Sequence, residues 1–161
     1  MSIEHFNRCV DDHSDAVYRF ILKNIKDEDK ARDIVQDAFE KLWEKLENVS
    51  PDKIKSYLFS TAYHKMIDVL RKDKRQNDFS MVKEELFSHN SQYTDLNEIL
   101  HDAIDRLPEI QKSVLLLRDY EGYSYNEISG ITGLNESQVK VYIYRARMYL
   151  KKYIGKMEIL I

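Results

Sequence analysis

The feature that most constrains the fold is a stretch near the C-terminus, residues 123–147, which has the pattern of two helices joined by a tight turn. Ser124 and Glu127 have the spacing of a capping box, in which a hydroxyl and a carboxylate cap the start of a helix reciprocally. Gly133 stands where a left-handed residue would end that helix, and Asn135 is a favourable N-cap for a second one. The stretch therefore predicts a helix-turn-helix.

The second of these helices has two chemically different faces. Its apolar residues recur at helical spacing and predict a packed face: Val139, Ile143, Ala146 and Leu150. The other face carries donors and cations: Ser137, Gln138, Lys140, Tyr144, Arg145, Arg147 and Lys151. Such a face suits a helix in a DNA major groove, with base contacts near its start and phosphate contacts along it. The alternative is an ordinary helical hairpin with a solvated basic face, but cations concentrated at one end of an acidic chain favour DNA binding.

Composition favours an all-α protein. The chain of 161 residues has four glycines and two prolines, 43% of its residues are hydrophobic, and no stretch alternates for long with the period of a strand. This length allows one ordinary domain or two small ones. A single cysteine, Cys9, excludes an internal disulfide and fits a reducing compartment. Because no apolar run could span a membrane and residues 1–5 do not resemble a signal peptide, we expect a soluble cytoplasmic protein.

Charge is distributed unevenly along a chain whose net charge is −3. Basic residues gather in 65–75 and 140–156, whereas 27–47 and 78–109 are acid-rich. Two basic blocks separated by an acidic one predict two DNA contacts on one polypeptide, and an acidic face elsewhere that meets a protein.

Apolar periodicity predicts one or two helices before Lys23, one over 27–47, and one that begins at Pro51 with Ser50 as its N-cap. The helix over 27–47 has a broad stripe that should be buried: Ala31, Ile34, Val35, Ala38, Phe39, Leu42, Trp43 and Leu46. The helix that follows mixes aromatic rings with the basic run that ends at Arg75: Tyr57, Phe59, Tyr63 and His64. Rings for base stacking beside cations for the backbone suit single-stranded DNA, although each ring fits a core equally well.

Residues 76–95 lose the clean periodicity and predict a flexible linker with a short helix around 82–87. The expected domains are therefore residues 1–75 and 96–161. In the second domain, Pro108 should open a helix that ends at Gly122.

Three residues near the N-terminus, His5, Cys9 and His13, recur every four residues, as metal ligands on one helix face would. A straight helix separates the first from the last by about 12 Å, which is too far for one zinc ion. A cysteine beside an apolar stripe also behaves as a small hydrophobe. We therefore expect no metal and no other cofactor. The sequence has no convergent acid–base or nucleophile set, so we do not expect an enzyme.

Several segments resemble the bacterial RNA polymerase sigma factors, specifically the extracytoplasmic-function (ECF) group of the sigma-70 superfamily. Residues 33–43 look like that group's polymerase-docking helix, and residues 56–71 are similar to its −10 recognition helix. Residues 107–111 and 139–147 match its region 4. The resemblance implies two small helical domains: a region 2 bundle and a four-helix region 4 with a helix-turn-helix, joined by the linker.

The resemblance also implies partners and site residues. The clamp coiled-coil of core polymerase would contact Asp33, Gln36, Asp37, Phe39 and Leu42, and the polymerase flap is a second expected contact. The loop over 48–55 would capture a base flipped from the melted non-template strand. The −10 strand would contact Tyr57, Tyr63, His64, Lys65, Arg71, Lys72 and Arg75. The −35 duplex would contact Arg118, Ser137, Gln138, Lys140, Val141, Tyr144, Arg145 and Arg147.

The expected function is therefore that of a sigma factor, which binds core polymerase, recognises −10 and −35 elements and promotes promoter opening. Val141 stands where the family commonly has a polar residue, so it would make an apolar contact, such as one with a thymine methyl group. An anti-sigma factor is a further expected partner, and region 4 is expected to fold back on region 2. The alternatives are a stand-alone helix-turn-helix regulator of duplex operators and an interaction module whose DNA face is unused.

Overall fold

A computed structural model of the chain describes residues 3–80 and 96–160, and these ranges contain helices and turns but no strand. This confirms the all-α prediction. The α-helices are α1 (Ile3–Ile25), α2 (Glu28–Glu44), α3 (Ile54–Ser80), α4 (Leu96–Asp105), α5 (Glu109–Leu115), α6 (Tyr125–Thr132) and α7 (Glu136–Leu160). A 3₁₀ turn, η1 (Pro51–Lys53), precedes α3, and a π-helical segment, η2 (Leu116–Tyr120), extends α5. No helix in the described ranges combines the length and the apolar character that a membrane span requires.

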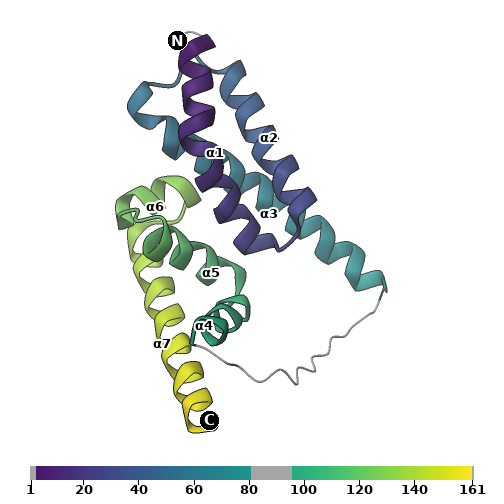
Figure 1. Cartoon of the computed structure of the whole chain (residues 1–161), viewed down its shortest axis with the longest axis vertical. Coiled ribbons are helices and arrows are strands. Elements are labelled where there is room, and N and C mark those ends of the chain that lie inside the picture. Colours follow the sequence, from purple (N-terminus) through teal and green to yellow (C-terminus); the bar gives the residue numbers. More distant parts are fainter. Residues whose placement is uncertain (1–2, 81–95, 161) are drawn as a thin grey trace.

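The N-terminal half, α1 to α3, is a bundle in which each helix packs against the other two (Figure 1). A sharp reversal joins α1 to α2: Lys26 has a left-handed backbone (φ 60°), and the Asp27 carboxylate accepts a hydrogen bond from the Lys30 amide at 3.1 Å. The centre of the bundle consists of fully buried side chains: Phe20, Ile21, Ile34, Leu42, Ile54, Leu58, Phe59 and Met66. Burial of each such side chain contributes about 1.5–3 kcal/mol, so the apolar stripes hold the half together.

One prediction for this half holds only in part, and another is wrong. Ser50 stands at the N-cap position of η1 and Pro51 in its first turn, as predicted, but the Ser50 side chain makes no capping hydrogen bond. The Ser50 carbonyl accepts from the Lys53 amide at 2.9 Å instead, because a 3₁₀ turn comes before the α-helix. Trp43 was expected in the buried stripe but is 48% exposed. It lies on the edge of that stripe near the end of α2, where its ring meets Phe6 edge-on with centroids 5.0 Å apart.

The C-terminal half is arranged around α7, which packs against α4, α5 and α6 (Figure 1). Pro108 precedes α5, and Gly122, with a left-handed backbone (φ 78°), follows η2. Pro108 and Gly122 therefore lie at the start and the end of this helical segment, as the sequence predicts. Four consecutive residues of α5 and η2 are buried: Val114, Leu115, Leu116 and Leu117. The helix α7 packs against α5, and η2 contacts α6.

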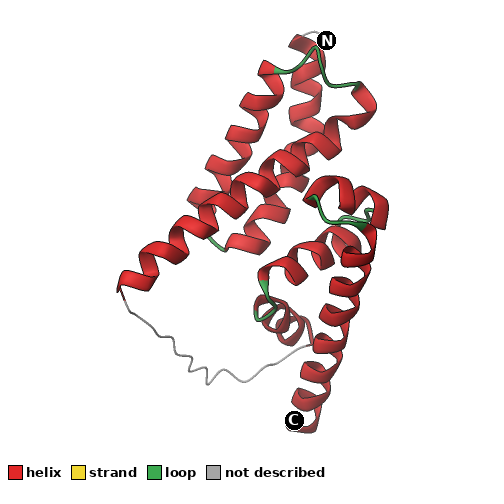
Figure 2. Ribbon diagram, turned by 180° about the vertical axis from the view of Figure 1, so that it is seen from behind, coloured by secondary structure: helices red, strands yellow, loops and turns green. Residues whose placement is uncertain are grey.

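The two halves pack against each other (Figures 1 and 2): α6 contacts α3, and α5 contacts α1. One hydrophobic core runs through both halves. Within it, the ring centroids of Phe59 and Tyr123 lie 5.3 Å apart. The helix α3 continues to Ser80, past the boundary expected at residue 75. The short helix expected around 82–87 lies outside the described residues.

Candidate nucleic-acid and protein interfaces

The first helix of the helix-turn-helix, α6, begins with the predicted capping box. The Ser124 hydroxyl accepts from the Glu127 amide at 3.1 Å, and the Ser124 amide donates to the Glu127 carboxylate at 2.9 Å. These hydrogen bonds favour the charged carboxylate, so the pKa of Glu127 lies below its ordinary value. The geometry fixes the start of α6 and confirms the prediction.

The turn between α6 and α7 is built from local hydrogen bonds around a left-handed glycine. Gly133 has φ 83°, and the Thr132 hydroxyl accepts from the Leu134 amide at 3.2 Å. Asn135 caps α7 by accepting from the Gln138 amide at 2.8 Å, and the Gln138 side chain accepts from the Asn135 amide at 3.0 Å. This second capping box was missed, although the spacing of Asn135 and Gln138 predicts one. It ties the Gln138 side chain to the turn.

The exposed face of α7 carries most of the residues predicted to contact the −35 duplex. Val139, Ile143 and Ala146 are buried, as predicted, and Leu150 is partly buried, whereas the donors and cations of the opposite face are exposed. Tyr144 is 65% exposed and Val141 is 44% exposed. A hollow of about 320 Å³ at the start of the helix is lined by Asn135, Ser137, Gln138, Val141, Tyr142 and Arg145. Donors and cations therefore surround an exposed apolar patch, which matches the mixed chemistry of base edges in a major groove.

Three cations of this half gather around one ring, Tyr125. The Arg118 guanidinium lies 4.6 Å from the ring centroid and the Lys140 ammonium 5.6 Å from it, within cation–π range. Arg118 also donates to the Tyr123 carbonyl at 2.9 Å. Arg147 forms two hydrogen bonds with Asp119, at 2.6 and 3.3 Å, and these bonds, with a smaller contribution from Tyr125, raise the pKa of Arg147. Two predicted phosphate contacts, Arg118 and Arg147, are thus held against the domain surface.

The residues predicted to contact the −10 strand all lie on α3 but differ in exposure. Arg71, Lys72, Arg75 and His64 are exposed, Lys65 and Tyr57 are partly covered, and Tyr63 is 4% exposed. Lys65 pairs with Asp37 at 3.4 Å, and the His64 ring nitrogen lies 2.8 Å from the Ser60 carbonyl. Burial, with a contribution from the nearby charge of Glu109 on α5, raises the pKa of Tyr63. The structure therefore buries Tyr63 in the core, away from the exposed cations of α3.

The predicted polymerase-docking residues of α2 divide into two layers. Asp33 and Gln36 are exposed and Asp37 is partly exposed, whereas Leu42 is fully buried and Phe39 is 8% exposed.

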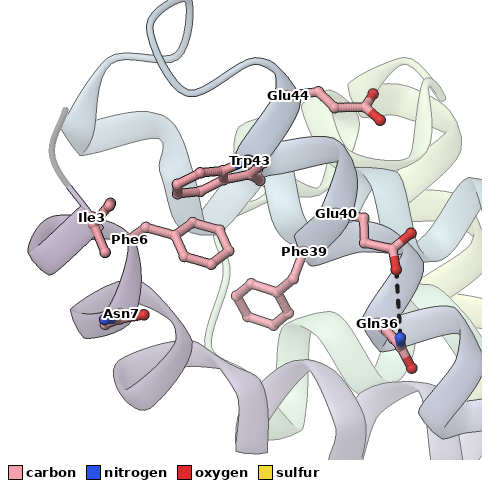
Figure 3. Close-up of a pocket in the computed structure, with 8 residues that line it drawn as sticks. All are labelled: Ile3, Phe6, Asn7, Gln36, Phe39, Glu40, Trp43 and Glu44. Atoms are coloured by element: carbon pink, nitrogen blue, oxygen red, sulfur yellow. Dashed lines mark hydrogen bonds between the residues drawn. The ribbon is translucent and has the colours of Figure 1, made fainter.

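Beside these residues, α1 and α2 border a hollow of about 630 Å³ (Figure 3). We name it the α1–α2 hollow; it is lined by Ile3, Phe6, Asn7, Gln36, Phe39, Glu40, Trp43 and Glu44. Trp43, which the sequence predicted to be buried, is an additional candidate contact residue at this hollow.

A second hollow of interest, of about 760 Å³, lies between the halves, and we name it the α3–α6 hollow. The N-terminal half contributes Lys45, Asn48, Val49, Ser50, Lys53, Ser56, Tyr57 and Ser60, and α6 contributes Asn126, Glu127 and Gly130. It therefore includes part of the loop that was expected to capture a flipped base.

Comparison with known proteins agrees with the two-part organisation. The family model of Sigma-70 region 2 matches residues 9–76, and that of Sigma-70, region 4 matches residues 97–150. RNA polymerase sigma factor SigV of Bacillus subtilis is 32% identical over 152 residues, which cover 94% of this chain and 92% of SigV. ECF RNA polymerase sigma factor SigM of the same organism is 28% identical over 84% of this chain and 86% of SigM.

A solved structure resembles the whole described arrangement. It is that of the sigma factor RpoE from Bartonella quintana, crystallised with the anti-sigma factor NepR. Its TM-score is 0.78 and its sequence identity 25%, over 95% of this chain and 98% of the RpoE chain. The chain therefore belongs to the ECF group of the sigma-70 family, proteins that are not enzymes themselves but direct RNA polymerase to promoters.

Proposed function

We propose that this chain docks on core polymerase through α2, binds the melted −10 strand through α3 and the preceding loop, and reads the −35 duplex through α7. The observation that carries the proposal is the exposed face of α7, where Lys140, Val141, Tyr144 and Arg145 face outward from a doubly capped helix-turn-helix. A rigid helix of this kind presents side chains to a major groove without further ordering.

The docking surface combines exposed acceptors with an aromatic anchor. Asp33 and Gln36 offer oxygen atoms to a basic or amide-bearing partner, and the half-exposed Trp43 supplies apolar area at the rim of the α1–α2 hollow. Interface energy concentrates in such aromatic residues beside polar surroundings. Leu42 and Phe39 would support this surface from beneath. We propose the clamp coiled-coil of polymerase as the partner that fits it.

The −10 site needs a pocket for a flipped base and cations for the backbone. Flipping a base out of the stack costs a few kcal/mol. Contacts between the protein and the flipped base must offset this cost if the promoter is to open without ATP. The α3–α6 hollow offers hydroxyl and amide groups beside the ring of Tyr57. The exposed cations further along α3 are placed to hold phosphates: Arg71, Lys72 and Arg75.

The partner that silences such a factor is an anti-sigma protein. The related RpoE was crystallised with the anti-sigma factor NepR, and the likeness extends over nearly all of both sigma chains. This likeness supports an anti-sigma partner for the present chain as well.

Reconstituted transcription tests the proposal. Core polymerase with the purified chain should start transcripts at discrete positions on fragments of genomic DNA, and core polymerase alone should not. The double variant Lys140→Ala/Arg145→Ala should lower these transcripts at least about tenfold, since each good base contact contributes about 1–3 kcal/mol. The charge-matched control on the same helix, Lys152→Ala/Lys156→Ala, should have a much smaller effect. Loss of all promoter dependence together with a polymerase-free palindromic footprint would instead indicate a stand-alone regulator.

A further inference from the structure

The side chain of Gln138 is oriented by the capping box at the start of α7. The Asn135 backbone amide donates to Gln138 Oε1 at 3.0 Å, and Asn135 Oδ1 accepts from the Gln138 backbone amide at 2.8 Å. Because a backbone N–H can only donate, the side-chain atom of Gln138 that it meets must be the oxygen and not the nitrogen. The cap therefore takes the acceptor end of the Gln138 side chain and leaves its NH₂ group for a ligand. Within the described part of the chain, that NH₂ group has no hydrogen-bond partner.

The hollow of about 320 Å³ at the start of α7, which we name the α7 hollow, combines donors with an apolar wall. Gln138, Val141 and Arg145 line it together, and their spacing of three and four residues makes them neighbours on one helix face. The Arg145 guanidinium carries donors only, and Val141 is 44% exposed. Among the lining residues, both side-chain carbonyl oxygens, those of Asn135 and Gln138, are engaged in the capping box. The α7 hollow therefore offers N–H groups and apolar surface to a ligand.

The four bases differ in how they would meet this surface. In the major groove, adenine and cytosine present amino groups, which require acceptors, whereas guanine and thymine present carbonyl oxygens, which require donors. Thymine alone has a methyl group beside its carbonyl oxygen. Its O4 can accept from the Gln138 NH₂ group while its methyl group packs on Val141. An adenine or a cytosine would instead place an amino group against the NH₂ group of Gln138.

We propose that Gln138 and Val141 together select one thymine in the −35 duplex, and that the capping box makes Gln138 the specificity-determining residue. This inference rests on the proposed function of α7 and names the base edge that the helix takes. It excludes the common contact of glutamine with adenine, which needs both the oxygen and the NH₂ group of the side chain. The oxygen is already held by Asn135.

The variant Gln138→Glu tests the inference because it changes the base edge that fits and keeps the cap. One carboxylate oxygen can still accept from the Asn135 backbone amide, as glutamate does in a capping box. The other oxygen then replaces the NH₂ group and can accept from the amino group of a cytosine. The preferred base at one position should therefore change from thymine to cytosine. Asn97→Asp is the matched control, since it adds the same charge at an exposed residue of α4, outside the α7 hollow.

Selection from a pool of random DNA duplexes measures this change. The pool is retained by the full chain, alone and with core polymerase, and the retained duplexes are sequenced. Wild type and Asn97→Asp should enrich thymine at the same position. Gln138→Glu should favour cytosine there by about tenfold, with the preferences at the other positions kept.

Base analogues in the enriched duplex separate the two contacts. Deoxyuridine in place of the thymidine removes only the methyl group and should weaken wild-type binding about fourfold. Val141→Ala should bind the two duplexes almost equally and still prefer thymine to cytosine. In 5-methylcytosine the methyl group stays and an amino group replaces O4. This base should bind wild type poorly and should be the best ligand of Gln138→Glu.

Three results would overturn the inference. Gln138→Glu could leave every base preference unchanged, the position that it alters could hold adenine or cytosine in the wild-type selection, or the chain could enrich no sequence in either form. Gln138→Ala is a second variant should the glutamate disturb the fold, and it should lose the thymine preference without gaining one for cytosine. The proposed function fails separately, because it requires transcripts with core polymerase, whereas the base preference can be read from duplexes that the chain retains alone.

Discussion

Replacement of Tyr123 by Phe should stabilise the protein. Within the part of the chain that the structure describes, the Tyr123 hydroxyl is a buried polar group that has no hydrogen-bond partner. Burial, with the nearby charges of Glu127 and Glu121, raises the pKa of Tyr123 far above its ordinary value. Phenylalanine keeps the ring and its contact with Phe59 and removes the unsatisfied group. The substitution therefore removes the free-energy cost of the buried, unpaired hydroxyl and keeps the packing of the ring.

The magnitude follows from the cost of a buried, unpaired polar group, about 1–3 kcal/mol. Each kcal/mol corresponds to about 2–4 °C in melting temperature for a chain of 150–250 residues, so the melting temperature of Tyr123→Phe should be about 2–12 °C higher. The direction in which pH changes the free energy of unfolding also follows from the raised pKa. Because the pKa is raised on folding, stability is fully present below the unfolded-state value and is lost as pH rises above about 10. The Phe variant should lose less stability there.

Urea unfolding and calorimetry, each at pH 7 and above pH 10, would measure both effects. Tyr144→Phe is the control: its side chain is 65% exposed, so the free energy of unfolding should change by less than about 0.5 kcal/mol. A loss of more than about 1 kcal/mol in Tyr123→Phe would refute the reasoning, because it would mean that the hydroxyl has a partner, such as a water molecule held by Glu121.

Four further predictions concern caps, docking and the core. Asn135→Ala should lower the free energy of unfolding by about 0.5–2 kcal/mol, measured by urea unfolding, since it removes the cap of α7. Glu127→Gln should be less stable than the wild type at neutral pH. The pKa of Glu127 is lowered on folding, so the wild-type advantage should disappear as pH falls below about 4 and through the folded-state value. Trp43→Ala should weaken binding to core polymerase by about 2 kcal/mol, roughly thirtyfold in titrations, with a small change in stability. Leu42→Ala should instead lower the free energy of unfolding by about 2–5 kcal/mol, because that side chain is fully buried.

The sequence determined the features whose partners lie within one or two turns of a helix. Ser124 and Glu127 are three residues apart, and Gly133 and Asn135 flank a turn of fixed geometry. Such contacts depend on the local backbone alone, so capping rules predicted them. The same holds for the buried stripe of α7, because helical periodicity decides which residues share a face. The all-α architecture and the helix-turn-helix followed from this local information.

Only the tertiary structure decided how far each face is covered. Periodicity placed Trp43 with Leu42 on one stripe of α2, but in the packed bundle Trp43 is half-exposed whereas Leu42 is fully buried. Tyr63 lies on a helix of cations and rings whose pattern fits a DNA surface and a core equally well, and only the tertiary structure shows that its side chain is buried in the core. The contact between Arg19 and Glu121 joins residues 102 positions apart. Helical periodicity carries no information on which distant surfaces meet, because that choice depends on the complementarity of whole faces.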